Sequence, residues 1–420
     1  MSKLVRTLRR CAAAIGLMLA VLIGAASAAL AADPIKVGFS MSMTGAVAPN
    51  GRQLLLALEI WRDDTNAAGG LLGRPVELVY YDDQSNPANV PGLYTKLLAI
   101  DKVDLLLGPY ATNMAAPAMP VIMNAKKTTL TMLAIGVNRH FNYDRYFSMV
   151  PVGPEGVKAF SRGYFELAAA QQPKPTTVAL ISADAEFAKT AADGARENAK
   201  AFGFSIVFER SYPPGTVDFG PVMRAVQAAN ADLVFAAAYP PDSVGIVRSA
   251  REIGLTAKMF GGTMVGLLAT PLKTQLGPAM NNIVIMESFV PGFDFPGLKD
   301  FLAKYRDRAK GQQIDPFGYG FGPFGYAAGQ ILAQAVTATK SLDHDQIAKY
   351  IHATSFTTVA GEVAFGADGE WARPRTVFSQ FQDVQPGNVE QFRDGSRQPV
   401  VWPAQYQTGT MIYPYTEAKR

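Results

Sequence analysis

The chain has 420 residues, 49% of them hydrophobic, and carries 39 basic and 35 acidic side chains. The first 31 residues hold four basic and no acidic residues, so the rest of the chain balances 35 basic against 35 acidic side chains. This balance gives no support to a basic surface for nucleic acid, and the length predicts about two domains with substantial cores.

Residues 1–31 have the pattern of an export signal peptide. A basic front precedes an apolar run over 12–26, and the end of the segment fits a small-x-small cleavage site. We place cleavage after Ala31, with Ala28 as the alternative. The apolar run is shorter than the roughly 20 residues of a membrane span, so we expect export without stable membrane insertion. The only cysteine, Cys11, lies in this segment, which excludes disulfides and zinc-thiolate sites from the exported chain.

Strand and helix patterns alternate from residue 35 to residue 150. Apolar runs predict strands, and residues that recur at helical spacing, such as Leu54, Leu58 and Trp61, predict helices. This repetition is typical of a parallel sheet covered by helices on both faces. Strands are expected over 35–40, 76–81, 104–107, 128–133 and 146–150, and helices over 54–68, 87–100 and 114–124.

The proline- and glycine-rich segment 151–154 interrupts this alternation, which then starts again. Two similar α/β units joined in this way predict two lobes around a cleft. Strands of the second unit are expected over 177–182, 205–209, 233–238, 259–262 and 282–286, and helices over 156–170, 186–202, 219–229 and 243–253. The remaining chain predicts helices over 298–305, 326–339 and 345–352, short strands near 363, 377–381 and 389–392, and a wrapping tail.

The stretch from Asp104 to Met119 is the strongest candidate for a ligand-binding edge. Gly108-Pro109 cuts its apolar run, which predicts a turn between a buried strand and a helix N-terminus. Ligands of open α/β sheets collect where strands end, and helix N-termini offer free N–H groups to anions. Thr112 adds a hydroxyl at this end. The alternative, that Thr112 is only an N-cap and Gly108-Pro109 only a turn, stays open at this point.

Two further motifs favour structural roles. The string from Gly320 to Gly325 matches G-x-G-x-x-G, but Asp315-Pro316 precedes it instead of a strand, and Pro323 removes an N–H donor, which argues against a nucleotide site. Asp82-Asp83 follows a predicted strand, where capping and turn formation are favoured over acid–base work.

The histidines and serines give no catalytic or metal pattern. His140, His344 and His352 lack the spacing of a metal site, and the chain has no G-x-S-x-G motif. Pairing of Ser40 or Ser42 with His140 in space stays open.

Six strings occur in an order and at spacings that are specific together, although none is diagnostic alone. They are Ile35-Lys36-Val37-Gly38, 63–73, Tyr81-Asp82-Asp83, Leu107-Gly108-Pro109, 232–235 and 251–255. In these strings the chain resembles the periplasmic solute-binding proteins of the branched-chain amino-acid (leucine-isoleucine-valine) type of ABC importer.

The resemblance implies an α/β fold of two doubly wound lobes, the type I periplasmic-binding-protein or Venus flytrap fold, joined by three crossing segments. The first lobe would take 32–152 and 288–376, and the second 153–287 and 377–420. A small-molecule carboxylate would bind between the lobes and close them by hinge motion, and the closed form would dock on the membrane permease of the importer. We expect a periplasmic, monomeric binding protein without a cofactor or metal, and not an enzyme.

The resemblance also implies ligand contacts in both lobes. In the first lobe, the ligand carboxylate would bind at Thr112, and the loop after the fourth strand would be the next contact. In the second lobe, Tyr239 would close over the ligand and Phe187 would add an aromatic contact. The full set of implied contacts is Tyr110, Ala111, Thr112, Ala134, Ile135, Gly136, Phe187, Tyr239, Thr263 and Phe321.

One departure from the family pattern concerns the ligand ammonium. Amino-acid binders of this type place an acidic residue after a Gly-Gly-like strand end, but here Gly261-Gly262 is followed by Thr263. A buried ammonium without a carboxylate partner costs several kcal/mol. We therefore expect a ligand with a carboxylate and no charged amine.

An aromatic cluster near residue 320, formed by Tyr319, Phe321, Phe324 and Tyr326, points to the body of the ligand. Of its members, Phe324 and Tyr326 are expected mainly in the core, whereas Phe321 is equally placed for core or cleft. We favour an aromatic or other apolar carboxylic or keto acid, with a branched-chain amino acid second. A ligand-sensing module for a membrane receptor is the alternative function, and a periplasmic enzyme ranks third.

Overall fold

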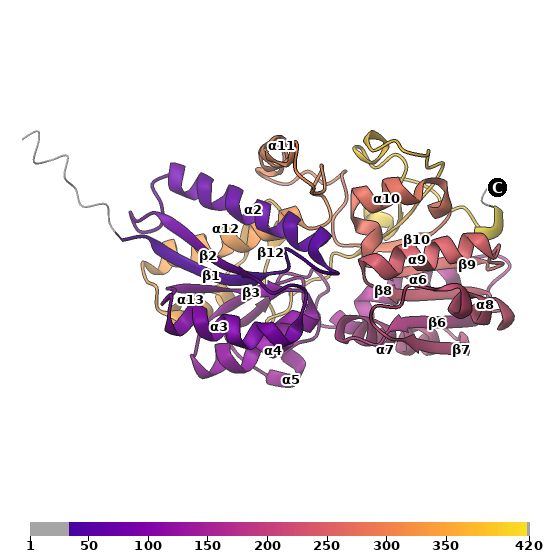
Figure 1. Cartoon of the computed structure of the whole chain (residues 1–420), viewed down its shortest axis with the longest axis horizontal. Helices are drawn as coiled ribbons and strands as arrows, with labels where there is room; N and C mark the ends of the chain where they lie inside the picture. Colours follow the sequence, from indigo (N-terminus) through magenta and orange to yellow (C-terminus); the bar gives the residue numbers. More distant parts are fainter. Residues whose placement is uncertain (1–32, 418–420) are drawn as a thin grey trace, which may run out of the picture.

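The computed structural model describes residues 33–417, so the predicted export signal lies outside the described residues. Two lobes lie side by side, and each is built on its own sheet (Figure 1). Within the described range, no helix combines the length and the apolar character that crossing a membrane requires.

The first lobe contains a parallel sheet of five strands in the order β2-β1-β3-β4-β5. This architecture confirms the β-α alternation predicted up to residue 150. The strands are β1 (Ile35–Met41), β2 (Val76–Asp82), β3 (Leu105–Tyr110), β4 (Thr129–Met132) and β5 (Tyr146–Ser148). The helices between them are α2 (Ala48–Ala67), η1 (Pro87–Asn89), α3 (Val90–Ala99), α4 (Thr112–Asn124) and α5 (Asn138–Phe141).

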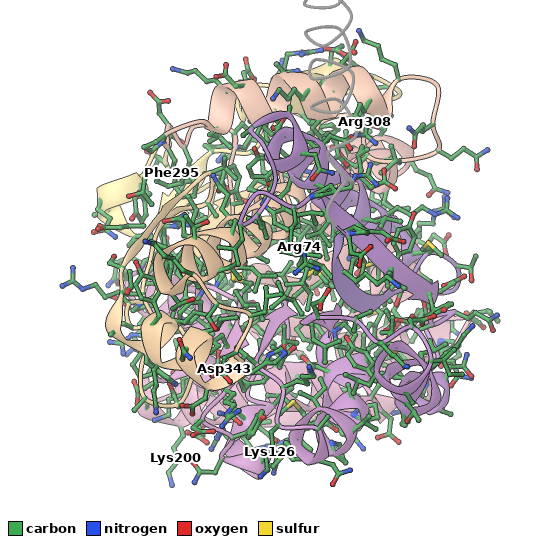
Figure 2. All side chains as sticks on the ribbon, turned by 90° about the vertical axis from the view of Figure 1, so that its left-hand side faces the viewer. Arg74, Lys126, Lys200, Phe295, Arg308 and Asp343 are labelled. Atoms are coloured by element: carbon green, nitrogen blue, oxygen red, sulfur yellow. The ribbon has the colours of Figure 1, made fainter. Side chains whose placement is uncertain are left out.

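Elements from late in the sequence return to this first lobe. They are α11 (Leu298–Ala309), α12 (Gly322–Thr339), α13 (His344–Ala353) and the antiparallel pair β11 (Phe356–Thr358) and β12 (Gly361–Val363). Helices α11 and α12 pack on α2. Arg308 of α11 binds Asp63 and Glu59 of α2 at 2.5 and 3.0 Å, at the end of the molecule seen in Figure 2.

The second lobe contains a sheet of seven strands in the order β14-β13-β10-β9-β8-β6-β7. Its first five strands in the chain pair in parallel, and the last two pair antiparallel. The strands are β6 (Thr177–Ala183), β7 (Ser205–Tyr212), β8 (Leu233–Ala238), β9 (Met259–Met264), β10 (Val284–Glu287), β13 (Val377–Gln380) and β14 (Val400–Trp402).

Helices cover this second sheet on both faces, as in other α/β folds. They are α6 (Gly156–Ala169), α7 (Glu186–Ala201), α8 (Gly220–Ala228), α9 (Pro240–Glu252), η2 (Val265–Leu268), α10 (Thr270–Leu276) and η3 (Gly277–Met280). The central strands β8 and β9 are buried at every position, which explains why their sequences read as continuous runs of small and apolar residues.

The predicted turn at Gly108-Pro109 is wrong, because both residues belong to strand β3. A Cβ atom at Gly108 would lie 2.5 Å from the Thr131 hydroxyl oxygen, so the glycine allows β3 to approach β4. Pro109 coincides with a register shift between these strands, a place where a strand tolerates the missing N–H. The chain turns instead at Ala111.

Two predictions near the C-terminus also need correction. The expected strand at 389–392 is the short 3-10 helix η4 (Glu390–Phe392). Strand β14, which pairs with β13, was not predicted; it begins at Val400 and includes the first two residues of the tail expected over the last twenty residues. Beyond β14 lie the short 3-10 helices η5 (Ala404–Tyr406) and η6 (Tyr415–Glu417).

Candidate ligand-binding site

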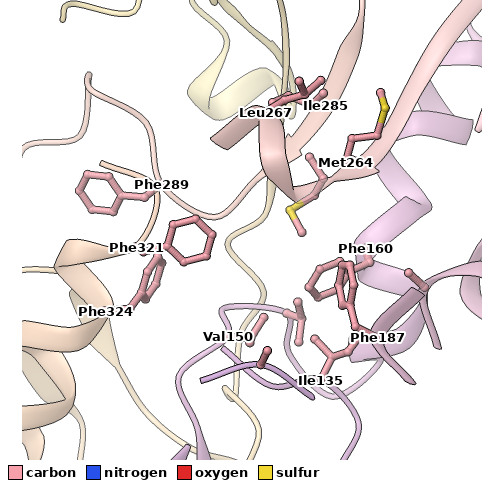
Figure 3. Packing of buried hydrophobic residues seen from close by; sticks show 14 of the residues in the cluster. Ile135, Val150, Phe160, Phe187, Met264, Leu267, Ile285, Phe289, Phe321 and Phe324 are labelled. Carbon is pink, nitrogen blue, oxygen red and sulfur yellow. The ribbon is translucent and has the colours of Figure 1, made fainter. Parts of the chain in front are cut away.

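An apolar cavity of about 50 Å³, here called the inner cavity, lies between the two lobes. Its walls come from the carboxyl ends of strands in both sheets and from segments that cross between the lobes. Figure 3 shows Phe160 and Phe187 on one side of this region and Phe321 on the other. The lining residues are Tyr110, Ala111, Thr112, Leu133, Val150, Phe160, Phe187, Tyr239, Val265, Leu268, Met286, Ser288, Gly320 and Phe321.

Thr112 is the first residue of α4 and is 2% exposed. Its hydroxyl oxygen accepts a hydrogen bond from the Ile135 N–H at 3.0 Å, so its own hydrogen remains available for donation. Ala111, not Thr112, occupies the N-cap position of α4, and no side chain caps this helix. The interpretation of Thr112 as a simple N-cap is therefore wrong. The helix start presents free N–H groups next to a hydroxyl donor, which suits an anion.

Two residues with unusual backbone angles stand at the edge of the inner cavity. Ala111 has φ 74° and ψ 150°, a region that is normally restricted to glycine, and Leu133 has φ 54°. Such strain is often found at ligand sites, because the surrounding fold holds the chain there for function. Both residues follow the ends of adjacent strands, β3 and β4.

Tyr110 and Phe321 form the aromatic wall on the side of the first lobe. Their rings meet edge to face, with centroids 5.7 Å apart. The Tyr110 hydroxyl accepts a hydrogen bond from the Asn50 side-chain amide at 2.9 Å. Burial raises the Tyr110 pKa, so the hydroxyl stays neutral and keeps a hydrogen to donate.

Phe187 lies at the centre of the aromatic wall on the side of the second lobe. Its ring contacts Phe160 with centroids 5.8 Å apart and Tyr239 with centroids 5.7 Å apart. Phe160 comes from α6, Phe187 from α7, and Tyr239 is the N-cap residue of α9. These side chains offer faces and edges for an apolar or aromatic ligand body.

A wider space of about 620 Å³, here called the outer chamber, adjoins the inner cavity. Tyr239 lines both spaces and so stands between them. The outer chamber has walls from both lobes, including Asn113 and Pro117 of α4 and Pro241 and Asp242 of α9. Ligand reaching the inner cavity from this side would pass the Tyr239 ring.

The two spaces differ in charge. None of the inner-cavity residues is acidic or basic, whereas Glu186 and Asp242 line the outer chamber. Asp242 is 5% exposed and accepts a hydrogen bond from the Tyr212 hydroxyl at 3.3 Å. Burial raises the Asp242 pKa. Sequence reasoning missed this carboxylate, because in the sequence it reads as an ordinary first-turn acidic residue of a helix.

A family model described as "Periplasmic binding protein" matches residues 34–383 of the chain. The chain belongs to the periplasmic binding protein family. A curated relative, the Leu/Ile/Val-binding protein homolog 8 of Brucella suis, is 25% identical over 384 residues, covering 88% of this chain and 93% of the relative. The members of this family are solute-binding proteins, as expected from the sequence, and not enzymes.

Solved structures share the fold. The substrate-binding protein of a branched-chain amino acid transporter from Streptococcus pneumoniae, in complex with isoleucine, has a TM-score of 0.73 and 22% identity, covering 88% of this chain and all of that chain. An ABC-transporter solute-binding protein from R. palustris, in complex with 4-hydroxybenzoate, has a TM-score of 0.73 and 22% identity, covering 85% of this chain and 95% of that chain.

In this periplasmic binding protein, six of the residues predicted as ligand contacts line the inner cavity. They are Tyr110, Ala111, Thr112, Phe187, Tyr239 and Phe321. The loop after β4 contributes Leu133 to the lining instead of Ala134, Ile135 or Gly136. Ile135 donates its N–H to the Thr112 hydroxyl oxygen, and Gly136 lines a separate polar cavity.

Thr263 lies in β9 and is 2% exposed, outside the lining of the inner cavity. Its hydroxyl has no hydrogen-bond partner within residues 33–417. The residues that follow it, Val265 and Leu268, line the cavity instead. These two residues were not predicted as ligand contacts, and neither were Val150, Met286 and Ser288, because no sequence motif marks them.

The aromatic cluster near residue 320 divides between cavity and core. Only Phe321 of this group lines the inner cavity. The Tyr319 hydroxyl donates to the Arg393 carbonyl oxygen at 2.8 Å, and the Tyr326 hydroxyl donates to Asp64 at 2.8 Å. Phe324 is fully buried against Phe289.

The Asp82-Asp83 pair has the predicted structural role. Asp82 accepts the Met43 and Gln84 N–H groups at 3.0 and 2.8 Å. Asp83 is buried, and the hydroxyls of Ser40 and Ser42 donate to it at 3.1 and 2.6 Å. Both serines are therefore engaged by Asp83, and the pairing with His140 that the sequence left open does not form.

Proposed function

We propose that the protein is the extracytoplasmic solute-binding component of an ABC importer and that it captures a carboxylate-bearing solute with an apolar or aromatic body. The observation that carries this proposal is the inner cavity, where neutral hydroxyl donors at a helix N-terminus meet aromatic walls without any ionised side chain. We expect the protein to act in the periplasm and to deliver its solute to a membrane permease.

The carboxylate is assigned to the start of α4. The N-terminus of this helix carries partial positive charge, and its first N–H groups have no acceptor within the helix. The Thr112 hydroxyl, fixed by its bond from Ile135, would donate a charge-assisted hydrogen bond to a carboxylate oxygen. Tyr110 adds a second neutral hydroxyl on the same side.

The apolar body is assigned to the space between the two aromatic walls. Tyr110 and Phe321 would contact one side of a ring or branched chain, and Phe187 and Tyr239 the other. The solved relatives in complex with isoleucine and with 4-hydroxybenzoate bind ligands that both join a carboxylate to an apolar body. The absence of an acidic residue from the lining described above favours the acid without an ammonium.

We propose that binding proceeds by hinge closure about the three segments that cross between the lobes. The first lobe is taken as residues 32–152 and 288–376, and the second as residues 153–287 and 377–420. The inner cavity, at about 50 Å³, is smaller than the roughly 300 Å³ at which ligand pockets begin, so a solute must enter with movement of the walls. Residues of both lobes line the cavity, so ligand would favour the closed state by its added contacts.

A branched-chain or aromatic amino acid is the second candidate ligand, and Asp242 is the observation that favours it. This carboxylate lines the outer chamber beside Tyr239 and would pair with a ligand ammonium if the ligand extended past that ring. The two candidates differ in one group only, because a keto acid has the same skeleton as its amino acid.

The test is a thermal-shift screen of the mature protein. One set of ligands contains leucine, isoleucine, valine and phenylalanine, and the other contains their 2-keto acids and benzoate. A ligand at a hundredfold excess over its Kd stabilises the fold by about 2.7 kcal/mol. We expect stabilisation by the acids alone, and Asp242→Asn should leave it unchanged. Stabilisation by amino acids that Asp242→Asn removes would overturn the acid assignment in favour of the second candidate.

A further inference from the structure

A second cavity between the lobes has the opposite chemistry to the inner cavity. It encloses about 250 Å³ and is here called the polar cavity. The first lobe contributes α5 and the turn 366–370, and the second contributes α6 and α7. The lining residues are Gly136, Arg139, Pro154, Glu155, Gly156, Val157, Lys158, Glu197, Asp368 and Glu370.

Glu370 is the outstanding side chain of the polar cavity. It is 5% exposed, and its two carboxylate oxygens make no hydrogen bond of normal geometry within residues 33–417, although the Ser148 hydroxyl and the Gly136 N–H lie near them. Its backbone is fixed, because its N–H donates to Asp368 at 3.0 Å and its carbonyl accepts the Gly366 N–H at 2.8 Å. The neighbouring Gly369 carbonyl accepts the Ser148 N–H of β5 at 2.8 Å. A buried ionised carboxylate without a partner destabilises the folded state unless a cation or a hydrogen-bond donor binds it.

No basic side chain of the polar cavity forms an ion pair with Glu370. The Lys158 ammonium lies 3.2 Å from Glu155 and 3.6 Å from Glu197, so two carboxylates of its own side engage it. Arg139 is exposed to solvent. The Ser148 hydroxyl donates to the Ala134 carbonyl at 2.8 Å. The cavity wall thus holds four acidic and two basic side chains, and the most buried of the carboxyl groups, Glu370, has no basic partner.

We propose that the polar cavity binds a small organic cation with an ammonium or guanidinium group, which pairs with Glu370 between the two lobes. The volume of about 250 Å³ exceeds by far the 10–15 Å³ that a single water needs, so a small cation fits in the cavity. Both Glu370 carboxylate oxygens are buried in this conformation, so the cation would reach them with a movement of the cavity wall. A metal ion is disfavoured, because residues 33–417 hold no group of three or more potential metal ligands. Occupation of the cavity would bridge the lobes and favour closure.

The protonation of Glu370 gives this assignment a pH dependence that can be tested. Burial raises its pKa to about 8, with Asp368 adding to the rise and the Ser148 hydroxyl and the Gly136 N–H opposing it. The other charged or titratable groups around it are Arg139 on α5, Glu155, Lys158 on α6, Glu197 on α7 and Tyr146 on β5. Burial holds the Tyr146 pKa well above its usual range, and the bond to Glu155 raises that of Lys158. Glu370 is therefore the group expected to change charge between pH 6 and pH 9.

The test measures binding of methylammonium chloride to the mature protein by thermal shift, with sodium chloride at equal ionic strength as the blank. We expect saturable stabilisation at pH 9. The apparent affinity should fall roughly ninetyfold at pH 6, where a pKa of about 8 leaves only about one Glu370 in a hundred ionised. Glu370→Gln should weaken binding at least tenfold, and Glu362→Gln, on the exposed face of β12, should leave it unchanged.

Two results would overturn the proposal: no saturable effect of methylammonium or guanidinium at pH 9, or equal binding by the wild type and Glu370→Gln. The wild-type pH dependence tests the proposal even if the variant folds poorly. Leucine and its 2-keto acid then identify the source of the cation. If Glu370→Gln weakens only leucine, the ammonium belongs to the transported solute; if it weakens neither, the cation binds separately. The keto-acid arm also reports on the inner cavity, so failure there is distinguishable from failure at Glu370.

Discussion

The inner cavity and the polar cavity share one loop but differ in chemistry. The loop 133–136 contributes Leu133 to the first and Gly136 to the second, while its Ile135 N–H positions Thr112. Around the inner cavity, the hydroxyls of Thr112 and Tyr110 each accept one hydrogen bond and keep one hydrogen to donate. In the polar cavity, both oxygens of Glu370 lack partners in the described structure.

This difference indicates two ways in which a cleft can present polar groups to a charged ligand. Neutral donors that are already half satisfied cost little when the cavity is empty, because only one hydrogen per group awaits a partner. An ionised carboxylate costs much more in the same situation, and it reduces the cost by taking up a proton. Removing a hydroxyl of the inner cavity should therefore mainly weaken ligand binding, whereas removing the Glu370 carboxylate should mainly raise the stability of the protein.

The largest expected effect is on stability at Glu370. Burial raises its pKa from the ordinary 4.5 to about 8, so the folded state holds a proton that the unfolded state releases between these pH values. Its contribution to stability is fully present below pH 4.5 and is lost as the pH rises to about 8. Glu370→Gln removes this loss and should raise the free energy of unfolding by about 4 kcal/mol at pH 8 to 9, with little change near pH 4.

Urea denaturation at pH 4.5, 6.5 and 8.5 measures this difference. Glu362→Gln is the matched control, because its carboxylate is exposed and accepts only the Ser355 hydroxyl. A constant difference between Glu370→Gln and the wild type at all three values would contradict the raised pKa.

The next effect concerns affinity at Thr112. Thr112→Val keeps the shape of the side chain but removes the hydroxyl proposed to bind the ligand carboxylate. We expect a loss of about 1.5 to 3 kcal/mol in binding free energy, which is typical of a buried charge-assisted hydrogen bond. Isothermal titration with the acid found in the ligand screen measures the loss. Thr112→Ser retains the hydroxyl and should bind within about threefold of wild type; unchanged affinity in Thr112→Val would refute the carboxylate assignment.

The sequence predicted the elements of both sheets better than it predicted the geometry of the cleft. Apolar runs and helical spacing are local signals, so most strands were placed within two residues, as at β8, where the predicted 233–238 matches Leu233–Ala238. Gly108-Pro109 misled for the same reason. Locally it has the composition of a turn, and only the close approach of β3 to Thr131 explains its place in a strand.

The two cavities show where local signals end. Thr112 was predicted because a hydroxyl at a strand end followed by a helix is a recognisable arrangement. Glu370 was not, because the polar cavity joins four segments that are far apart in sequence, near Gly136, Lys158, Glu197 and Glu370 itself. Asp242 was missed because its position at a helix start gives no sign that it faces a cleft.

A smaller effect is expected at Thr263. Its hydroxyl is buried without a partner in the described residues, so Thr263→Val removes a polar group that gains nothing in the folded state. We expect the free energy of unfolding to rise by about 1 to 2 kcal/mol. Ligand affinity measured in parallel should not change, because Thr263 lies outside the inner-cavity lining. A fall in affinity would instead restore Thr263 as a ligand contact.

The smallest effect is expected at Ala111, where the strain of the inner cavity is concentrated. Its φ of 74° and ψ of 150° cost an alanine about 1 to 3 kcal/mol, whereas glycine adopts them freely. Ala111→Gly also increases the entropy of the unfolded chain, which offsets about 0.5 to 1 kcal/mol, so a net gain near 1 kcal/mol is expected by thermal denaturation. Ala111→Val should be destabilising, because a β-branched side chain suits positive φ even less. If Ala111→Gly stabilised the fold but weakened ligand binding, the backbone strain at Ala111 would serve to orient the Thr112 hydroxyl. The inner cavity would then be destabilised through its backbone, whereas the polar cavity is destabilised through the side chain of Glu370.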